Sequence, residues 1–183
     1  TTHKKGRCLM SLLREKVGRM LLVGFEGLHP PEYILEWLAE GRIGGVVFFA
    51  RNVESPTQLA DLVRSVQSAA KHPPLIAIDQ EGGIVARLRE GFSESPGAMA
   101  LGAADSETLA EQVAAALGAE LRTLGINFNL APVVDIGHDS SNPVISTRTL
   151  GAQADRVSRL AVAQVRGFQS AGVAACAKHF PGH

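Results

Sequence analysis

The sequence has little of what marks several large classes of protein. It holds two cysteines, Cys8 and Cys176, which we interpret as free thiols, and no pattern that predicts a metal site. Its 18 basic and 18 acidic residues balance, which argues against nucleic acid as the main partner. No apolar run approaches the roughly 20 residues that a membrane helix needs. No GxGxxG or GxxxxGK(S/T) loop follows a predicted strand, so nucleotide binding is disfavoured and no cofactor is expected.

Export signals are also missing from the start of the chain. The first seven residues are basic, but the apolar stretch from Cys8 to Leu13 is short and meets the charged run Arg14-Glu15-Lys16. We therefore expect a cytoplasmic protein with no membrane partner. A hydrophobic content of 45% is sufficient for a globular core.

Apolar runs alternate with helical patterns along most of the chain. The runs predict five buried strands, at 19–25, 44–49, 75–78, 127–134 and 172–177. Ser55 before Pro56 and Ser106 before a long apolar stripe predict two helix starts. That stripe is Leu109, Val113, Leu117, Leu121 and Leu124. The stretch from Arg87 to Asp105, with Pro96 and several glycines, is predicted to be irregular.

Five strand–helix units are compatible with two architectures. One is a complete doubly wound sheet of five strands, and the other is roughly the first five units of a (β/α)₈ barrel. Length favours the sheet, because a complete barrel typically needs about 250 residues. The polar groups favour the barrel, because the third, fourth and fifth strands all end in charged or imidazole-bearing loops, whereas a doubly wound sheet concentrates its site at one switch point.

The polar residues after these strands each have an ordinary structural alternative. Asp79 could cap the turn before two glycines, and Arg87 and Arg148 could be surface cations with Asp135 as their partner. Lys178 is harder to dismiss, because a lysine that ends an apolar strand needs a partner or a cavity. Together these carboxylates, cations and imidazoles predict a cup for a polyhydroxylated ligand.

Four motifs, taken in order, resemble glycoside hydrolase family 3 in its bacterial β-N-acetylhexosaminidase branch. They are Ile78-Asp79-Gln80-Glu81-Gly82-Gly83 with Arg87, Asn129-Leu130-Ala131-Pro132-Val133-Val134-Asp135, Asn142-Pro143-Val144-Ile145 with Arg148, and Lys178-His179-Phe180-Pro181-Gly182-His183. The last of these points to N-acetylglucosaminidases rather than to the β-glucosidases of the family. One departure is Ile84, where the family usually has arginine. The resemblance covers almost the whole chain.

The resemblance implies a fold, a reaction and a set of sugar-binding residues. Residues 1–183 are expected to form the N-terminal part of a (β/α)₈ barrel, with no second domain. The implied reaction is retaining hydrolysis that removes terminal β-linked N-acetylglucosamine from an oligosaccharide or muropeptide, in cytoplasmic peptidoglycan recycling. The residues implied to hold the sugar are Asp79, Arg87, Arg148, Lys178 and His179. Glu81 and Asp135 are expected to support them from behind.

The catalytic residues implied by the family are expected beyond His183. In that branch a histidine paired with an aspartate donates the proton, and an aspartate on a later strand is the nucleophile. We therefore expect a fragment that binds sugar and is inactive alone, with open strand edges that favour self-association. The alternatives left open are a non-catalytic carbohydrate-binding fragment and a family 3 β-glucosidase.

Overall fold

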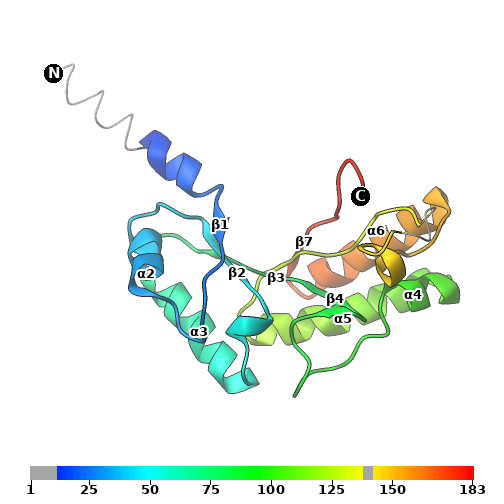
Figure 1. The fold of residues 1–183 in the computed structure, drawn as a ribbon, viewed down its shortest axis with the longest axis horizontal. Coiled ribbons are helices and arrows are strands. Elements are labelled where there is room, and N and C mark those ends of the chain that lie inside the picture. The colour runs from blue at the N-terminus through cyan, green and yellow to red at the C-terminus, as the bar shows by residue number, and fades with distance from the viewer. Residues whose placement is uncertain (1–11, 138–141) are drawn as a thin grey trace. The chain divides into compact units, whose positions relative to one another are not determined.

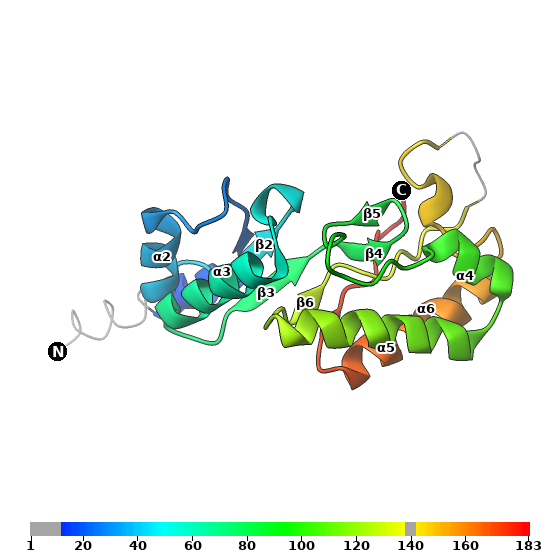
Figure 2. The same ribbon diagram turned by 90° about the horizontal axis from the view of Figure 1, so that it is seen from below.

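The computed structural model describes residues 12–137 and 142–183, so Cys8 lies outside the described residues. Residue contacts group the chain into two compact units, Thr1–Ala77 and Ile78–His183. Figures 1 and 2 show the fold from two directions. Across the described ranges, no helix combines the length and the apolar character that crossing a membrane requires.

The first unit alternates strands with helices. After a helix at 12–18, its elements are β1 (Leu22–Val23), α2 (Glu32–Ala39), β2 (Gly45–Phe48), the short 3-10 helix η1 (Ala50–Asn52), α3 (Pro56–Ala69) and β3 (Leu75–Ile78), which runs into the second unit. Strands β1 and β2 are parallel neighbours, with Leu22 opposite Gly45. β3 lies next to β2. Gly45 permits this close packing, because a Cβ there would lie 1.8 Å from the Leu75 carbonyl oxygen.

Helix α3 forms where its start signals predict. The Ser55 hydroxyl oxygen accepts the Gln58 N–H, and Pro56 occupies the first turn. The side chains at helical spacing are fully buried, namely Leu59, Leu62, Val63 and Val66. Apolar spacing and capping thus predicted both the position of this helix and its buried face.

The second unit contains two long helices and the remaining strands. Its elements are β4 (Gln80–Gly82), β5 (Val85–Ala86), α4 (Ala98–Ala104), α5 (Glu107–Thr123), β6 (Phe128–Asn129), the 3-10 helix η2 (Ser146–Arg148), α6 (Ala154–Ser170) and β7 (Ala174–Ala175). β6 and β7 are parallel, and the Leu130 N–H donates to the Ile78 carbonyl beside β3 at 2.8 Å. The predicted fourth and fifth strands are thus present but short. The prediction of an irregular stretch from Arg87 to Asp105 is wrong in part, because this stretch holds α4.

Helices α5 and α6 lie side by side in both views (Figures 1 and 2). The predicted apolar stripe of α5 is only partly right: Leu117 and Leu121 are buried, but Leu109 is 40% exposed. The buried face instead includes small residues such as Gly118. A Cβ on Gly167 of α6 would lie 2.3 Å from the Glu111 carbonyl oxygen, so small residues set the distance between the helices.

Candidate functional site

The candidate site lies within the second unit, on the segments that follow β3, β6 and β7. Asp79 comes directly after β3, and Asp135 follows the isolated parallel bridge between Val133 and Lys178. The Lys178 N–H donates to the Pro132 carbonyl at 2.9 Å, and the Val134 N–H donates to the Lys178 carbonyl at 2.6 Å. This pairing brings Lys178 and the residue after it beside Asp135.

Five of the predicted residues form one continuous network of ion pairs. The Lys178 ammonium lies 2.6 Å from Asp79 Oδ1 and 2.7 Å from Glu81 Oε1. Arg148 holds Glu81 in a bidentate pair, with its Nε and Nη2 atoms 2.9 and 2.8 Å from the two carboxylate oxygens. Arg87 Nη2 donates to Asp79 Oδ2 at 3.3 Å. Two carboxylates therefore share three cations, and Lys178 joins the two halves.

The electrostatics of the network favour its charged forms. Burial of Asp79 raises the pKa of its carboxyl, but the hydrogen bond and charge of Lys178 and the charge of Arg87 outweigh burial and hold that pKa below its ordinary value. The hydrogen bonds to Glu81 raise the pKa of Arg148 against the effect of burial. Asp79 is thus an acceptor-only carboxylate near neutral pH, with spare lone pairs on both oxygens.

A second cluster joins Asp135 to the two histidines of the last motif. Asp135 Oδ2 accepts from His179 Nδ1 at 2.6 Å and from the His179 N–H at 3.1 Å, and Oδ1 accepts from the His183 N–H at 2.7 Å. Burial raises the pKa of Asp135, but these hydrogen bonds outweigh burial and hold the pKa below its ordinary value. An ionised Asp135 fixes the proton on His179 Nδ1 and leaves Nε2 as the ring atom available to a ligand.

The side chains of these two clusters differ in exposure. The side chains of Glu81 and Asp135 are 6% and 2% exposed. The predicted ligand-contacting side chains are more accessible: their exposures are Arg148 12%, Asp79 14%, Lys178 15%, Arg87 28% and His179 34%. The structure thus brings all seven predicted residues together in two clusters, with two carboxylates innermost.

Several residues that hold the site in place had no predicted role. Gln80 and Asn129 are buried amides that bond to the backbone around Asp79, Glu81 and Arg87. The Thr149 hydroxyl donates to the Asp135 carbonyl at 2.7 Å. Gln80 and Asn129 do stand inside the recognised motifs, so their position was the available signal.

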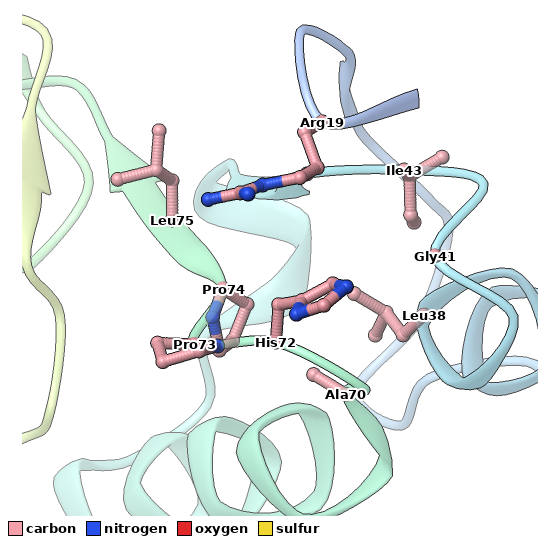
Figure 3. Close-up of a pocket in the computed structure, with 10 residues that line it drawn as sticks. Arg19, Leu38, Gly41, Ile43, Ala70, His72, Pro73, Pro74 and Leu75 are labelled. Atoms are coloured by element: carbon pink, nitrogen blue, oxygen red, sulfur yellow. The ribbon is translucent and has the colours of Figure 1, made fainter. Parts of the chain in front are cut away.

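A separate cavity of about 220 Å³ lies in the first unit, with Arg19 and His72 among its lining residues (Figure 3). Gly44 and Leu75 place it at the starting ends of β2 and β3. Glu15 contacts His72 closely and lies 2.7 Å from Lys71 Nζ, and these hydrogen bonds lower the pKa of Glu15. The cavity includes none of the predicted site residues, and Glu15 ties the 12–18 helix to the loop before β3.

Among the described residues, no group of three or more histidine, cysteine, aspartate or glutamate side chains is arranged to hold a metal ion. The carboxylates of the two clusters are instead bonded to lysine, arginine and histidine. The expected absence of a metal site stays a prediction for the whole protein.

Strand–helix units whose charged side chains gather after successive strands define an α/β protein of the barrel class. The family described as "Glycosyl hydrolase family 3 N terminal domain" matches residues 12–183. The chain belongs to this family. The predicted fold, a (β/α)₈ barrel present in part, is confirmed by this match and by the solved structures below.

The most informative relatives are β-hexosaminidases. Beta-hexosaminidase A of Pseudoalteromonas piscicida is 44% identical over 163 residues, which are 84% of this chain and 27% of that protein. Beta-hexosaminidase of Stenotrophomonas maltophilia (strain R551-3) is 40% identical over 170 residues, which are 90% of this chain and 50% of that protein. The chain therefore spans half or less of the length of these two relatives.

Two solved structures of related enzymes also match most of this chain. A glycoside hydrolase family 3 beta-N-acetylglucosaminidase from Paenibacillus sp. str. FPU-7 matches with a TM-score of 0.90 and 47% identity, over 93% of this chain and 33% of that one. NagZ from Neisseria gonorrhoeae, in complex with N-trifluoroacetyl-D-glucosamine, matches with a TM-score of 0.83 and 33% identity, over 89% of this chain and 50% of that one. The predicted family and its β-N-acetylhexosaminidase branch are confirmed.

Proposed function

We propose that this chain carries the sugar-binding part of a retaining β-N-acetylhexosaminidase that releases terminal N-acetylglucosamine. The observation that carries the proposal is the difference in exposure among the side chains of the two clusters. The side chains of Asp79, Lys178 and Arg87 stay partly exposed, while Glu81 and Asp135 are buried against their hydrogen-bond partners. A pre-organised set of donors and acceptors suits sugar hydroxyls, which both donate and accept.

Each accessible group has a distinct role in this proposal. The Asp79 carboxylate accepts from sugar hydroxyls, since Lys178 and Arg87 each use only one lone pair of its oxygens. Lys178, Arg87 and Arg148 donate to ring oxygens and hydroxyls, and His179 presents Nε2. We assign no nucleophile or proton donor among these residues; in the proposed retaining reaction they bind and orient the sugar.

The bound analogue in the Neisseria gonorrhoeae structure supports a glucosamine-type ligand. We propose that the natural substrate is an oligosaccharide or a muropeptide that ends in β-linked N-acetylglucosamine. We further propose a role in cytoplasmic peptidoglycan recycling, which rests only on the resemblance of the motifs. Self-association through open strand edges likewise stays a prediction.

Calorimetric titration of the full natural protein with N-acetylglucosamine tests the proposal. We expect Asp79→Ala to weaken binding by about 100-fold, because it removes an acceptor for charge-assisted contacts and frees two cations. Asp61→Ala, in an exposed pair with Arg64 on α3, is the matched control and should bind as the wild type does. Equal binding by the Asp79 and Asp61 variants would remove the site assignment. Binding without hydrolysis of an aryl β-N-acetylglucosaminide would favour a non-catalytic carbohydrate-binding protein.

A further inference from the structure

Gln80 stands between the two carboxylates of the network and points the other way. Successive side chains of an extended segment alternate between faces, and Asp79 and Glu81 both reach the Lys178 ammonium. The Gln80 side chain therefore lies on the opposite face, and the residue is only 2% exposed. A buried amide in this position needs partners, and the partners are the backbone of the segment that carries Arg87.

The hydrogen bonds of the Gln80 side chain all go to the backbone of the segment that carries Arg87. Its Oε1 accepts the Arg87 N–H at 2.8 Å and the Leu88 N–H at 3.0 Å, and its Nε2 donates to the Leu88 carbonyl at 3.0 Å. Because Oε1 meets two donors and Nε2 meets an acceptor, only one orientation of the amide fits. The side chain thus fixes where the backbone of Arg87 lies.

The backbone of Gln80 is fixed by a second buried amide. Asn129, at the end of β6, is 0% exposed; its Oδ1 accepts the Gln80 N–H at 3.0 Å and its Nδ2 donates to the Gln80 carbonyl at 2.9 Å. These two bonds imitate a strand pairing at a point where β3 has already ended. Asn129 therefore holds the segment that carries Asp79 and Glu81, and Gln80 holds Arg87 against that segment.

We infer that Gln80 is a positioning residue of the sugar site, which acts by holding Arg87 at its distance from Asp79. The inference rests on the proposed sugar-binding function. A purely structural role predicts a loss of stability alone. A positioning role predicts in addition a loss of affinity that depends on the presence of the Arg87 side chain.

The test is Gln80→Glu in the full natural protein, which keeps the shape of the side chain but places an oxygen against the Leu88 carbonyl. We expect N-acetylglucosamine to bind about ten-fold more weakly, and the KM of an aryl N-acetylglucosaminide to rise in parallel. The reason is that a displaced Arg87 side chain would lose most of its contribution to sugar affinity. In an Arg87→Ala background the same change should alter binding by less than about two-fold, because the group that it displaces is gone.

Asn52→Asp is the matched control. Asn52 is also 0% exposed and also clamps backbone, since its Nδ2 donates to the Phe25 and Gly27 carbonyls and its Oδ1 accepts the Phe49 N–H. Its conversion to aspartate should lower the melting temperature and leave sugar affinity unchanged. If Gln80→Glu behaves in the same way, or weakens binding equally in both backgrounds, the positioning role is wrong.

Hydrogen exchange on the wild type decides the matter if Gln80→Glu does not fold. The inference predicts that the Arg87 and Leu88 amides exchange slowly, and more slowly still with N-acetylglucosamine bound. Exchange at the rate of an unprotected amide, with or without the sugar, would overturn it. Failure of the wild type to bind N-acetylglucosamine would instead refute the proposed function, while slow exchange would still establish the clamp itself.

Discussion

Two groups of ion pairs in the second unit use the same kinds of side chain at similar distances. In the candidate site, Asp79 and Glu81 pair with Arg87, Arg148 and Lys178 at 2.6 to 3.3 Å. On the surface of the helices, arginines of α6 pair with acidic residues of α5 and of the turn before it at 3.0 to 3.7 Å. We call these groups the site network and the helix network.

The two networks differ in exposure. Side chains of the site network are 6% to 28% exposed, whereas those of the helix network are 38% to 49% exposed. Water and salt screen the exposed pairs, so each contributes little, whereas a buried charge that loses its partner is strongly destabilising. Distances alone would rank the two networks as near equals, and burial separates them.

The largest expected effect comes from Glu81→Ala. It leaves the mostly buried Arg148 and Lys178 side chains without their shared carboxylate, which should cost about 3 to 5 kcal/mol in the free energy of unfolding. Urea denaturation of the full natural protein measures it. Glu81→Gln keeps the shape and two acceptor lone pairs and should cost less. A loss below about 1 kcal/mol for Glu81→Ala would place the site network in the same class as surface pairs.

Acid should lower the free energy of unfolding through Asp79 and Asp135. The effect of each carboxyl should be smaller than that of Glu81→Ala. Both have a pKa below the ordinary value in the folded protein, so their contribution to stability is complete above the unfolded value, about pH 4. It is lost as the pH falls through the lower folded values. Asp135→Asn removes one of these titrations, so its unfolding free energy should fall less than that of the wild type between about pH 4 and pH 2. Parallel pH profiles would contradict this.

The sequence predicted best those helices, strands and clusters that strongly apolar, capping or charged residues mark. The order of strands and helices and the cap at Ser55 could be predicted, because apolar runs and capping residues mark them. Strand ends and motifs also pointed to the seven residues that the structure brings together in two clusters, and their role in binding stays a prediction. Helix α4 was missed because its residues are mainly alanine, its N-cap is a glycine, Gly97, and few of its side chains are buried. The buried face of α5 was misplaced because alanine and glycine give little hydrophobic signal.

The pairing of arginines could not be predicted at all. A motif marks Arg148 in the sequence and none marks Arg166, but no sequence pattern identifies the carboxylate that pairs with either arginine. Glu81 lies 67 residues from Arg148, and Glu111 lies 55 residues from Arg166, so the tertiary structure decides both pairings. The comparison of the two networks is therefore a result of the structure.

The smallest expected effect is that of Arg166→Gln in the helix network, and it sets the scale for the others. Arg166 is 49% exposed and pairs with Glu111 at 3.0 Å and Glu107 at 3.7 Å. Glutamine has a similar helix propensity, so the change removes the ion pairs and little else, and should cost about 0.5 kcal/mol or less. The same urea denaturation at low and high salt measures it: salt should shrink the difference from the wild type towards zero. A salt-independent loss as large as that of Glu81→Ala would mean that exposure does not separate the two networks.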